Sequence, residues 1–265
     1  MNTLYIVGTP IGNLKDITFR AVETLQKVDF IACENTAHTI VLLKQYKINK
    51  PLVSYHKFSE RQKSNEIIER ILAGESCALV SDAGMPAISD PGAILVREAI
   101  DKGIKVESVP GVSAITTAIS ISGLDYIGFS FLGFLPEKDK DKRTILSNFK
   151  ESLYPLVLYV APHDLEKISQ FLLKELGDRK VTAVKELTKI YETVYETSLS
   201  NFEIDNTKGE FVLIIHPAEK KELEDGEIIE LIKQELQKGR TKKETVSYLS
   251  RKYNINKNRI YQLTL

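Results

Sequence analysis

The chain has 265 residues, of which 43% are hydrophobic, and its 36 lysines and arginines balance 36 aspartates and glutamates. The length allows two domains of ordinary size, and the composition excludes a largely disordered chain. The longest weakly polar stretch, 114–124, contains Thr and Ser and is shorter than the roughly 20 apolar residues that a membrane-spanning helix needs; the start of the chain also lacks the pattern of a signal peptide. We therefore expect a cytoplasmic protein in which Cys33 and Cys77 are buried, reduced thiols.

Short β-rich runs alternate with helix-length segments along the first half of the chain. We expect strands at 4–7, 30–33, 77–81 and 105–109, separated by helices such as 19–27 and 65–73. Such alternation is typical of a mostly parallel sheet covered by helices. The sequence therefore predicts an α/β domain over residues 1–118.

A second series of apolar runs follows. We expect strands near 131–134, 156–160, 181–185 and 211–215, which predict a second α/β domain over residues 119–218. Between the first two of these strands, the charged segment 137–143 follows a proline. We expect this segment to be an exposed and mobile loop.

The last part of the chain, 219–265, has a helical pattern and ends in a basic tail. Apolar residues at helical spacing lie within 228–236, and Thr241 and Glu244 have the spacing of a capping box. A second helix and a turn at 254–256 precede a short apolar stripe, which predicts a small helix-turn-helix-like unit. The basic face of this unit either binds RNA phosphates or is simply a solvated face of a docked tail. Its candidate RNA-binding residues are Arg240, Lys242, Lys243, Lys257 and Arg259.

Glycine-rich segments follow three of the predicted strands, at 8–14, 81–92 and 109–114. In an open α/β sheet, ligands bind beyond the carboxyl ends of the strands, so these loops are expected to converge on one cleft. None of them has the pattern of a dinucleotide-binding or phosphate-binding loop. The pattern favours a ligand without a diphosphate, although glycine and proline also occur in ordinary turns.

Five motifs in order along the chain carry a resemblance to a known family. They are Y-I-V-G-T-P-I-G-N-L-K-D-I-T (5–18), L-V-S-D-A-G-M-P-A-I-S-D-P-G (79–92), V-P-G-V-S-A (109–114), G-F-L-P (133–136) and E-L-T-K-x-x-E-T (186–193). With them, the chain resembles the ribosomal small-subunit RNA (cytidine-2′-O)-methyltransferase family over nearly its whole length. The resemblance implies the two-domain tetrapyrrole-methylase fold, the class III fold of S-adenosylmethionine-dependent methyltransferases. It also implies S-adenosyl-L-methionine in the cleft between the domains, a homodimer, and a cytidine ribose of 16S rRNA in the small ribosomal subunit as target.

Carried over position by position, the resemblance implies a set of cofactor contacts drawn from both domains. Asn13 and Lys15, with the neighbouring Asp16, are expected at the mouth of the cleft, where they either contact RNA or cap the helix that begins near Thr18. The implied cofactor-binding residues are Pro10, Gly84, Met85, Ile88, Ser89, Ser113, Ala114, Tyr159, Glu186 and Leu187.

The chain departs from the family pattern at four positions. Where the family has Glu-Asp-Thr-Arg-His, this sequence reads E-N-T-A-H (34–38), and where the family has Tyr-Glu-x-x-His-Arg, it reads Y-V-A-P-H-D (159–164). An acid and an arginine are thus absent from each motif, the changed residues being Asn35, Ala37, Val160 and Asp164.

Methyl transfer to a ribose hydroxyl needs alignment of the reactants, help in removing the proton, or both. Glu34 is our first candidate for the proton acceptor because it lies in the matching motif, and the others are His38, Asp82 and Asp90. The two aspartates could instead fix their own turns, and the histidine could be an ordinary helix residue. No metal site is expected.

Two other functions fit the same sequence. One is a small-molecule methylase that acts on a tetrapyrrole, for which a basic helical tail has no evident use. The other is an RNA-binding or ribosome-binding protein that keeps the fold but has weak or altered catalysis, as the four departures suggest. A steep salt dependence of RNA affinity would support both RNA functions, and only an assay of methyl transfer separates them.

Overall fold

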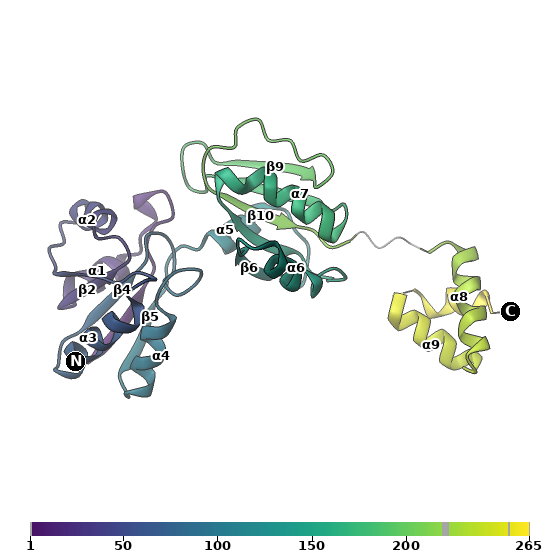
Figure 1. The fold of residues 1–265 in the computed structure, drawn as a ribbon, viewed down its shortest axis with the longest axis horizontal. Helices are drawn as coiled ribbons and strands as arrows, with labels where there is room; N and C mark the ends of the chain where they lie inside the picture. Colours follow the sequence, from purple (N-terminus) through teal and green to yellow (C-terminus); the bar gives the residue numbers. More distant parts are fainter. Residues whose placement is uncertain (1, 219–222, 254, 265) are drawn as a thin grey trace. The chain divides into compact units, whose positions relative to one another are not determined.

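A computed structural model describes residues 2–218, 223–253 and 255–264 of the chain. The chain divides into two compact units, residues 1–218 and residues 219–265 (Figure 1). The larger unit contains two five-stranded sheets, and the smaller unit is helical. Among the described residues, no helix is both long enough and apolar enough to cross a membrane.

The first sheet is entirely parallel, in the strand order β3-β2-β4-β1-β5. All four strands predicted in this half of the chain are confirmed, and the sequence missed only the three-residue edge strand β3. The strands are β1 (Thr3–Val7), β2 (Phe30–Cys33), β3 (Leu52–Ser54), β4 (Cys77–Val80) and β5 (Lys105–Val109).

Helices cover both faces of this sheet because alternate residues of each strand point to opposite faces. Leu4 and Leu79 pack against α3 and α4, whereas Val7 and Val80 pack against α1 and α2. Cys33 and Cys77 are buried and unpaired, as expected. The helices are α1 (Phe19–Lys27), α2 (Thr36–Gln45), α3 (Glu60–Leu72) and α4 (Ala93–Asp101).

The second sheet is mixed, in the order β6-β7-β10-β8-β9, with β6 parallel to β7 and every other pair antiparallel. Its four predicted strands are confirmed, and β9 was missed because half of its residues are exposed and it lies at the sheet edge. Helix α5 covers one face, and α6 and α7 cover the other. The elements are α5 (Ala114–Ile121), β6 (Ser130–Phe134), α6 (Asp139–Ser147), β7 (Leu156–Val160), α7 (Leu165–Leu176), β8 (Lys180–Lys185), β9 (Thr193–Ser198) and β10 (Phe211–Ile215).

The prediction of a mobile charged loop at 137–143 is wrong, because most of this segment forms the first turns of α6. The Lys142 side chain is buried, and its Nζ lies 3.1 Å from Asp139 Oδ1 and 5.0 Å from the centre of the Phe171 ring. Leu146, one turn later, is fully buried against α7 and the sheet. The alternating charges predicted a solvated loop, but the segment begins an amphipathic helix whose buried face includes the aliphatic part of the Lys142 side chain.

The smaller unit packs three helices around its own core, formed by residues such as Ile228, Leu249 and Ile260. The predicted capping box is confirmed: Thr241 N–H donates to Glu244 Oε2 at 2.9 Å, and Glu244 N–H donates to Thr241 Oγ1 at 3.3 Å. The predicted turn at 254–256 includes Asn254, which lies outside the described residues. The helices are α8 (Asp225–Gln237), α9 (Lys242–Tyr253) and α10 (Lys257–Gln262).

Candidate active site

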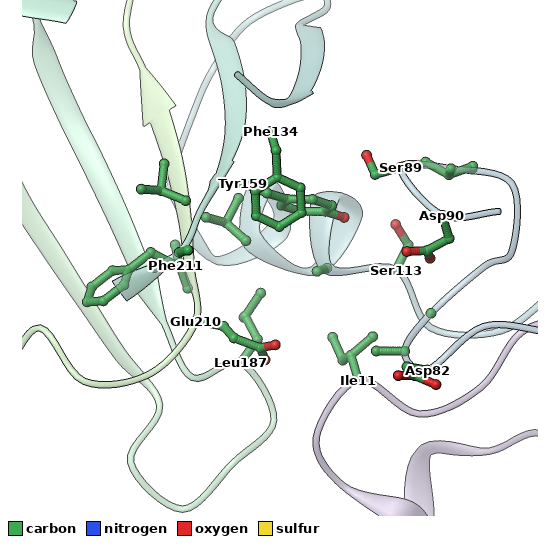
Figure 2. Close-up of a pocket in the computed structure, with 18 of the residues that line it drawn as sticks. Ile11, Asp82, Ser89, Asp90, Ser113, Phe134, Tyr159, Leu187, Glu210 and Phe211 are labelled. Atoms are coloured by element: carbon green, nitrogen blue, oxygen red, sulfur yellow. The ribbon is translucent and has the colours of Figure 1, made fainter. Parts of the chain in front are cut away.

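A cavity of about 350 Å³ lies between the two sheets of the larger unit, at the carboxyl ends of the parallel strands. We call the parts of the larger unit around the parallel and the mixed sheet its first and second domain. Figure 2 shows loops of the first domain on one side of this cavity and Tyr159, Phe134 and Leu187 of the second domain on the other. Its lining residues are Ile11, Asp82, Ala83, Gly84, Met85, Ile88, Ser89, Asp90, Ser113, Ala114, Phe134, Tyr159, Val160, Ala161, Pro162, Val184, Leu187, Glu210, Phe211 and Val212.

The three glycine-rich loops meet as predicted, through backbone contacts that leave no room for side chains. Thr9 N–H donates to the Gly84 carbonyl at 2.9 Å and Gly84 N–H donates back to the Thr9 carbonyl at 3.1 Å, which joins the first loop to the second. A Cβ added at Gly8 would lie 2.7 Å from both Cα and N of Gly111, in the third loop. Glycine at these two positions therefore permits the close approach of the first and third loops.

Strained backbone is concentrated in the segments around the cavity. Outside glycine, five described residues have positive φ, and four of them lie here: Ala87 and Ser89 in the second loop, and Glu186 and Thr188 between β8 and β9. Such conformations cost about 1–3 kcal/mol each and persist where the surrounding structure enforces them, often at functional sites.

The second domain supplies an aromatic and aliphatic wall. The Tyr159 ring on β7 contacts two rings of the β6 region, with centroid distances of 4.9 Å to Phe131 and 5.4 Å to Phe134. Leu187 packs with Ile11 of the first loop in a shared apolar cluster. A ligand in the cavity would thus touch backbone, Asp82 and Asp90 on one side, and a mostly apolar surface with Glu210 at its edge on the other.

Three carboxylates influence one another on the first-domain side. Burial, followed by the charges of Glu34 and Asp82, raises the pKa of Asp90 to about 6. Burial and Asp82 likewise raise the pKa of Glu34. The Oδ1 atom of Asp82 is buried and has no hydrogen-bond partner among the described residues, which leaves one acceptor available to a ligand.

A carboxylate outside the lining set holds the second loop in place. Glu60, at the start of α3, accepts hydrogen bonds from Gly92 N–H at 3.0 Å and from the Tyr55 hydroxyl at 3.4 Å. Gly92 has φ of +144°, and a Cβ there would lie 2.8 Å from the Leu79 side chain. The sequence did not indicate this contact, because Glu60 lies 32 residues before Gly92.

Eight of the ten positions assigned to the cofactor by resemblance line the cavity. Of the other two, Pro10 is buried beside Ile11, and Glu186 holds the rim: its Oε1 accepts from Glu210 N–H at 3.0 Å and from Lys189 Nζ at 2.9 Å. The eight that line it are Gly84, Met85, Ile88, Ser89, Ser113, Ala114, Tyr159 and Leu187.

The four candidate catalytic residues differ in whether they line the cavity. Asp82 and Asp90 line the cavity, whereas Glu34 and His38 do not. Glu34 is half-buried at the end of β2, close enough to affect the pKa of Asp90, and His38 is exposed in the first turn of α2. By position, Asp82 and Asp90 are therefore better candidates for the proton acceptor than Glu34, which the sequence ranked first.

The departures from the family pattern have separate local environments. Asn35 caps α2, where its Oδ1 accepts from the N–H groups of Ala37 at 3.0 Å and His38 at 3.2 Å, as an aspartate would. Ala37 is exposed, and Asp164 lies directly before α7. Val160 alone lines the cavity, so a carboxylate of the family pattern is replaced there by an apolar side chain.

Several proposed RNA contacts have partners within the chain. Asn13 Oδ1 accepts from Lys15 N–H at 3.1 Å, which is a capping contact, while the Lys15 side chain is exposed. In the tail, Arg240 pairs with Glu235 and Arg259 with Asp225, at 2.7 and 2.8 Å.

The remaining tail lysines differ from one another. Lys242 Nζ donates to the Thr264 carbonyl at 3.0 Å, which joins the start of α9 to the end of the tail. Lys243 and Lys257 are exposed, and their side chains have no partner within the part of the tail that the structure describes. Within the described part of the tail, these two lysines are therefore the proposed RNA-binding residues whose charges are unpaired.

Sequence reasoning missed most of the second-domain wall. Some missed residues belong to motifs quoted from the sequence, so their motif positions were a signal that could have been used; they are Ile11, Ala83, Phe134, Val160, Ala161 and Pro162. The other missed residues come from buried strands and their ends, where no local pattern distinguishes a cavity wall from core; they are Val184, Glu210, Phe211 and Val212.

Comparisons with known proteins agree with this architecture. Residues 3–203 match the family Tetrapyrrole (Corrin/Porphyrin) Methylases. The chain is 38% identical to the ribosomal RNA small subunit methyltransferase I of Bacillus subtilis, over 98% of this chain and 93% of that protein. It is 46% identical to the protein of the same name from Mycoplasmopsis pulmonis, over 81% and 97% of the two chains. The protein of that name from Thermotoga maritima is 41% identical, over 81% and 98%.

Solved structures share the fold at low sequence identity. A diphthine synthase has a TM-score of 0.67 and 19% identity, with 81% of this chain and 90% of that chain covered. A uroporphyrin-III-C-methyltransferase from Thermus thermophilus has a TM-score of 0.58 and 19% identity, covering 82% and 94%. At this identity, the likeness supports the fold alone.

Proposed function

Because the chain belongs to the tetrapyrrole (corrin/porphyrin) methylase family, and within it to the ribosomal RNA small subunit methyltransferase I group, we propose that it methylates a cytidine ribose 2′-hydroxyl of 16S rRNA. S-adenosyl-L-methionine is the proposed methyl donor, and the cytoplasm, which contains small ribosomal subunits, is the proposed location. The observation that carries the proposal is the cavity where three backbone-lined loops meet an aromatic wall, with Asp82 and Asp90 on the side of the loops.

The residues of the cavity fit the chemistry of this donor. S-adenosylmethionine has no phosphate, carries a positive sulfonium, and offers hydroxyl and amino donors to protein acceptors. The unpaired Asp82 Oδ1 can accept a hydrogen bond from one of these hydroxyl or amino groups, and carboxylates stabilise the positive charge of the sulfonium. The cavity volume of about 350 Å³ is within the range of small-molecule sites.

We propose that Asp90 accepts the proton that the ribose hydroxyl releases during methyl transfer. When bound, the donor supplies an activated methyl group; transfer forms a C–O bond, breaks the S–C bond and releases the hydroxyl proton. With a pKa of about 6, Asp90 is mostly ionised at neutral pH and can accept that proton. Burial and the charge of Asp90 raise the pKa of Tyr159 to about 12, so its neutral ring forms the opposite wall.

The decisive experiment measures transfer of a labelled methyl group to small ribosomal subunits and to isolated 16S rRNA, both from cells that lack this protein. We expect donor-dependent labelling of a cytidine ribose in the unaltered protein. Asp90→Asn should bind the donor and lose most turnover, whereas Glu34→Gln should keep it, since Glu34 does not line the cavity. Donor binding without any labelling of RNA would overturn the proposed function.

We propose that the tail contributes affinity for RNA rather than chemistry. Lys243 and Lys257 are the free cations for phosphate, and Arg240 and Arg259 stabilise the tail through their acidic partners. The double variant Lys243→Gln, Lys257→Gln should weaken binding to 16S rRNA. It should also lower the number of counterions released on binding, read from the slope of log affinity against log salt concentration, by about two. An unchanged salt slope would remove the tail from the RNA interface.

We also propose a homodimer that uses the exposed apolar surface formed by residues 121–129 and 153–154. Ile127 is fully exposed, and Leu153 and Tyr154 are 60% and 47% exposed. The two segments are adjacent, because Ser130 N–H donates to the Pro155 carbonyl at 2.9 Å. Such a patch is typical of a protein interface. Sedimentation should show a dimer that Ile127→Asp dissociates and that Ile100→Asp, on α4, leaves intact; a monomeric unaltered protein would refute the dimer.

A further inference from the structure

The loop between β8 and β9 presents two large apolar side chains to solvent at the rim of the cavity. Ile190 is 94% exposed and Tyr191 is 77% exposed. Among the described residues, no hydrogen bond or ring contact involves either side chain. Three residues earlier in the same loop, Leu187 lines the cavity.

The exposure does not arise from a loose loop. Glu186 and Thr188 hold left-handed backbone conformations, with φ of 52° and 64°. Thr188 N–H donates to Glu192 Oε2 at 2.6 Å, and Lys189 Nζ bridges Glu186 and Glu210 at 2.9 and 3.0 Å. The chain therefore fixes this loop with polar contacts and strain, while its apolar tip contributes nothing to the core.

The loop that carries this tip is in contact with the first glycine loop, whose Ile11 also lines the cavity. A Cβ added at Gly12 would lie 2.6 Å from Lys189 Cγ and 2.8 Å from Thr188 Oγ1, so the two loops are in direct contact. Lys15, three residues after Gly12 in the same segment, has an exposed cationic side chain. An apolar platform and a nearby positive charge are complementary to a nucleobase and its phosphate.

We propose that Ile190 and Tyr191 form a stacking platform for a nucleobase next to the ribose that enters the cavity. This inference rests on the proposed function. A ribose hydroxyl can enter the cavity only if its nucleotide is unstacked from its neighbours, and a fixed aromatic ring at the rim offsets part of the cost of unstacking. Tyr191 supplies the ring and Ile190 supports the edge of the base.

The test is steady-state methyl transfer to small ribosomal subunits by Tyr191 variants. Tyr191→Ala should raise the KM for the subunit roughly 5- to 100-fold, the range for loss of one base stack, and leave the affinity for S-adenosylmethionine unchanged. Tyr191→Phe should behave like the unaltered protein because it keeps the ring. Tyr191→Leu should resemble Tyr191→Ala, since it keeps apolar area without a stacking face.

A matched pair of isoleucine variants serves as control. Ile190→Ala should raise the KM, whereas Ile100→Ala should not, because Ile100 is 53% exposed near the far end of α4, whose other end follows the second cavity loop. An unchanged KM in Tyr191→Ala would overturn the inference while labelling by the unaltered protein still supports the proposed function. Dissociation of a dimer by Tyr191→Ala in sedimentation would instead assign the tip to a protein interface and also overturn it.

Discussion

The contact between Gly8 and Gly111 gives the sharpest test of how the loops form the cavity. In Gly8→Ala, the new Cβ would lie 2.7 Å from Gly111 Cα and N, whereas non-bonded carbon atoms prefer about 3.5–4.0 Å. The first and third loops would have to separate by about 1 Å. Overpacking of this kind costs about 1–3 kcal/mol, and here the clashing atoms are backbone, which cannot rotate away.

We therefore expect Gly8→Ala to lower the free energy of unfolding by about 1–3 kcal/mol in chemical denaturation. Calorimetry should also show at least about a ten-fold weaker affinity for S-adenosylmethionine, equivalent to ~1.4 kcal/mol. Gly226→Ala is the matched control, since Gly226 lies in α8 with no atom within 4 Å of an added Cβ, and it should leave donor affinity unchanged. If Gly8→Ala binds the donor as tightly as the unaltered protein, the packed loops do not form the donor site.

Four further outcomes follow from three single side chains. Because the pKa of Asp90 is raised to about 6, methyl transfer should increase as the pH rises through about 6, and Asp90→Asn should abolish that increase. Because the pKa of Asp90 is higher in the folded than in the unfolded protein, its contribution to the free energy of unfolding is fully present below the unfolded pKa of 3.8 and is lost as the pH rises through about 6. In denaturant titrations, Asp90→Asn should therefore gain stability relative to the unaltered protein above pH 6. Asn35→Ala should lower the free energy of unfolding by about 1 kcal/mol through loss of the α2 cap, while Asn35→Asp should not. Arg259→Ala, which breaks the pair with Asp225, should lower tail stability by about 1 kcal/mol or less in thermal melts followed by circular dichroism, and a larger loss would assign Arg259 a wider role.

The sequence predicted the elements whose pattern is local. The buried strands of both sheets and the glycine turns after β1, β4 and β5 follow from apolar runs and from residues that punctuate loops. The capping box of α9 follows from the spacing of Thr241 and Glu244 alone. These features depend on neighbours within a few residues, which is the information that one sequence carries.

Features that depend on distant contacts were not accessible in the same way. Lys142 looked solvated because its burial depends on Phe171, 29 residues later. Glu34 ranked above Asp90 by motif, yet only the packing of the two sheets decides which carboxylate lines the cavity. Arg259 looked like a free cation because its acidic partner, Asp225, lies 34 residues earlier, at the start of α8.

The left-handed residues Ala87, Ser89, Glu186 and Thr188 place the least relaxed backbone of the larger unit on both sides of the cavity. The polar contacts that hold the segment at 186–192 are partly exposed to solvent, so we expect this strained backbone to open at lower free energy than the buried strands beneath it. Warming should therefore release this rim segment while the sheets stay intact. Heat inactivation of this protein would then begin as a local, reversible loss of donor affinity, at temperatures where far-ultraviolet circular dichroism is still that of the native fold.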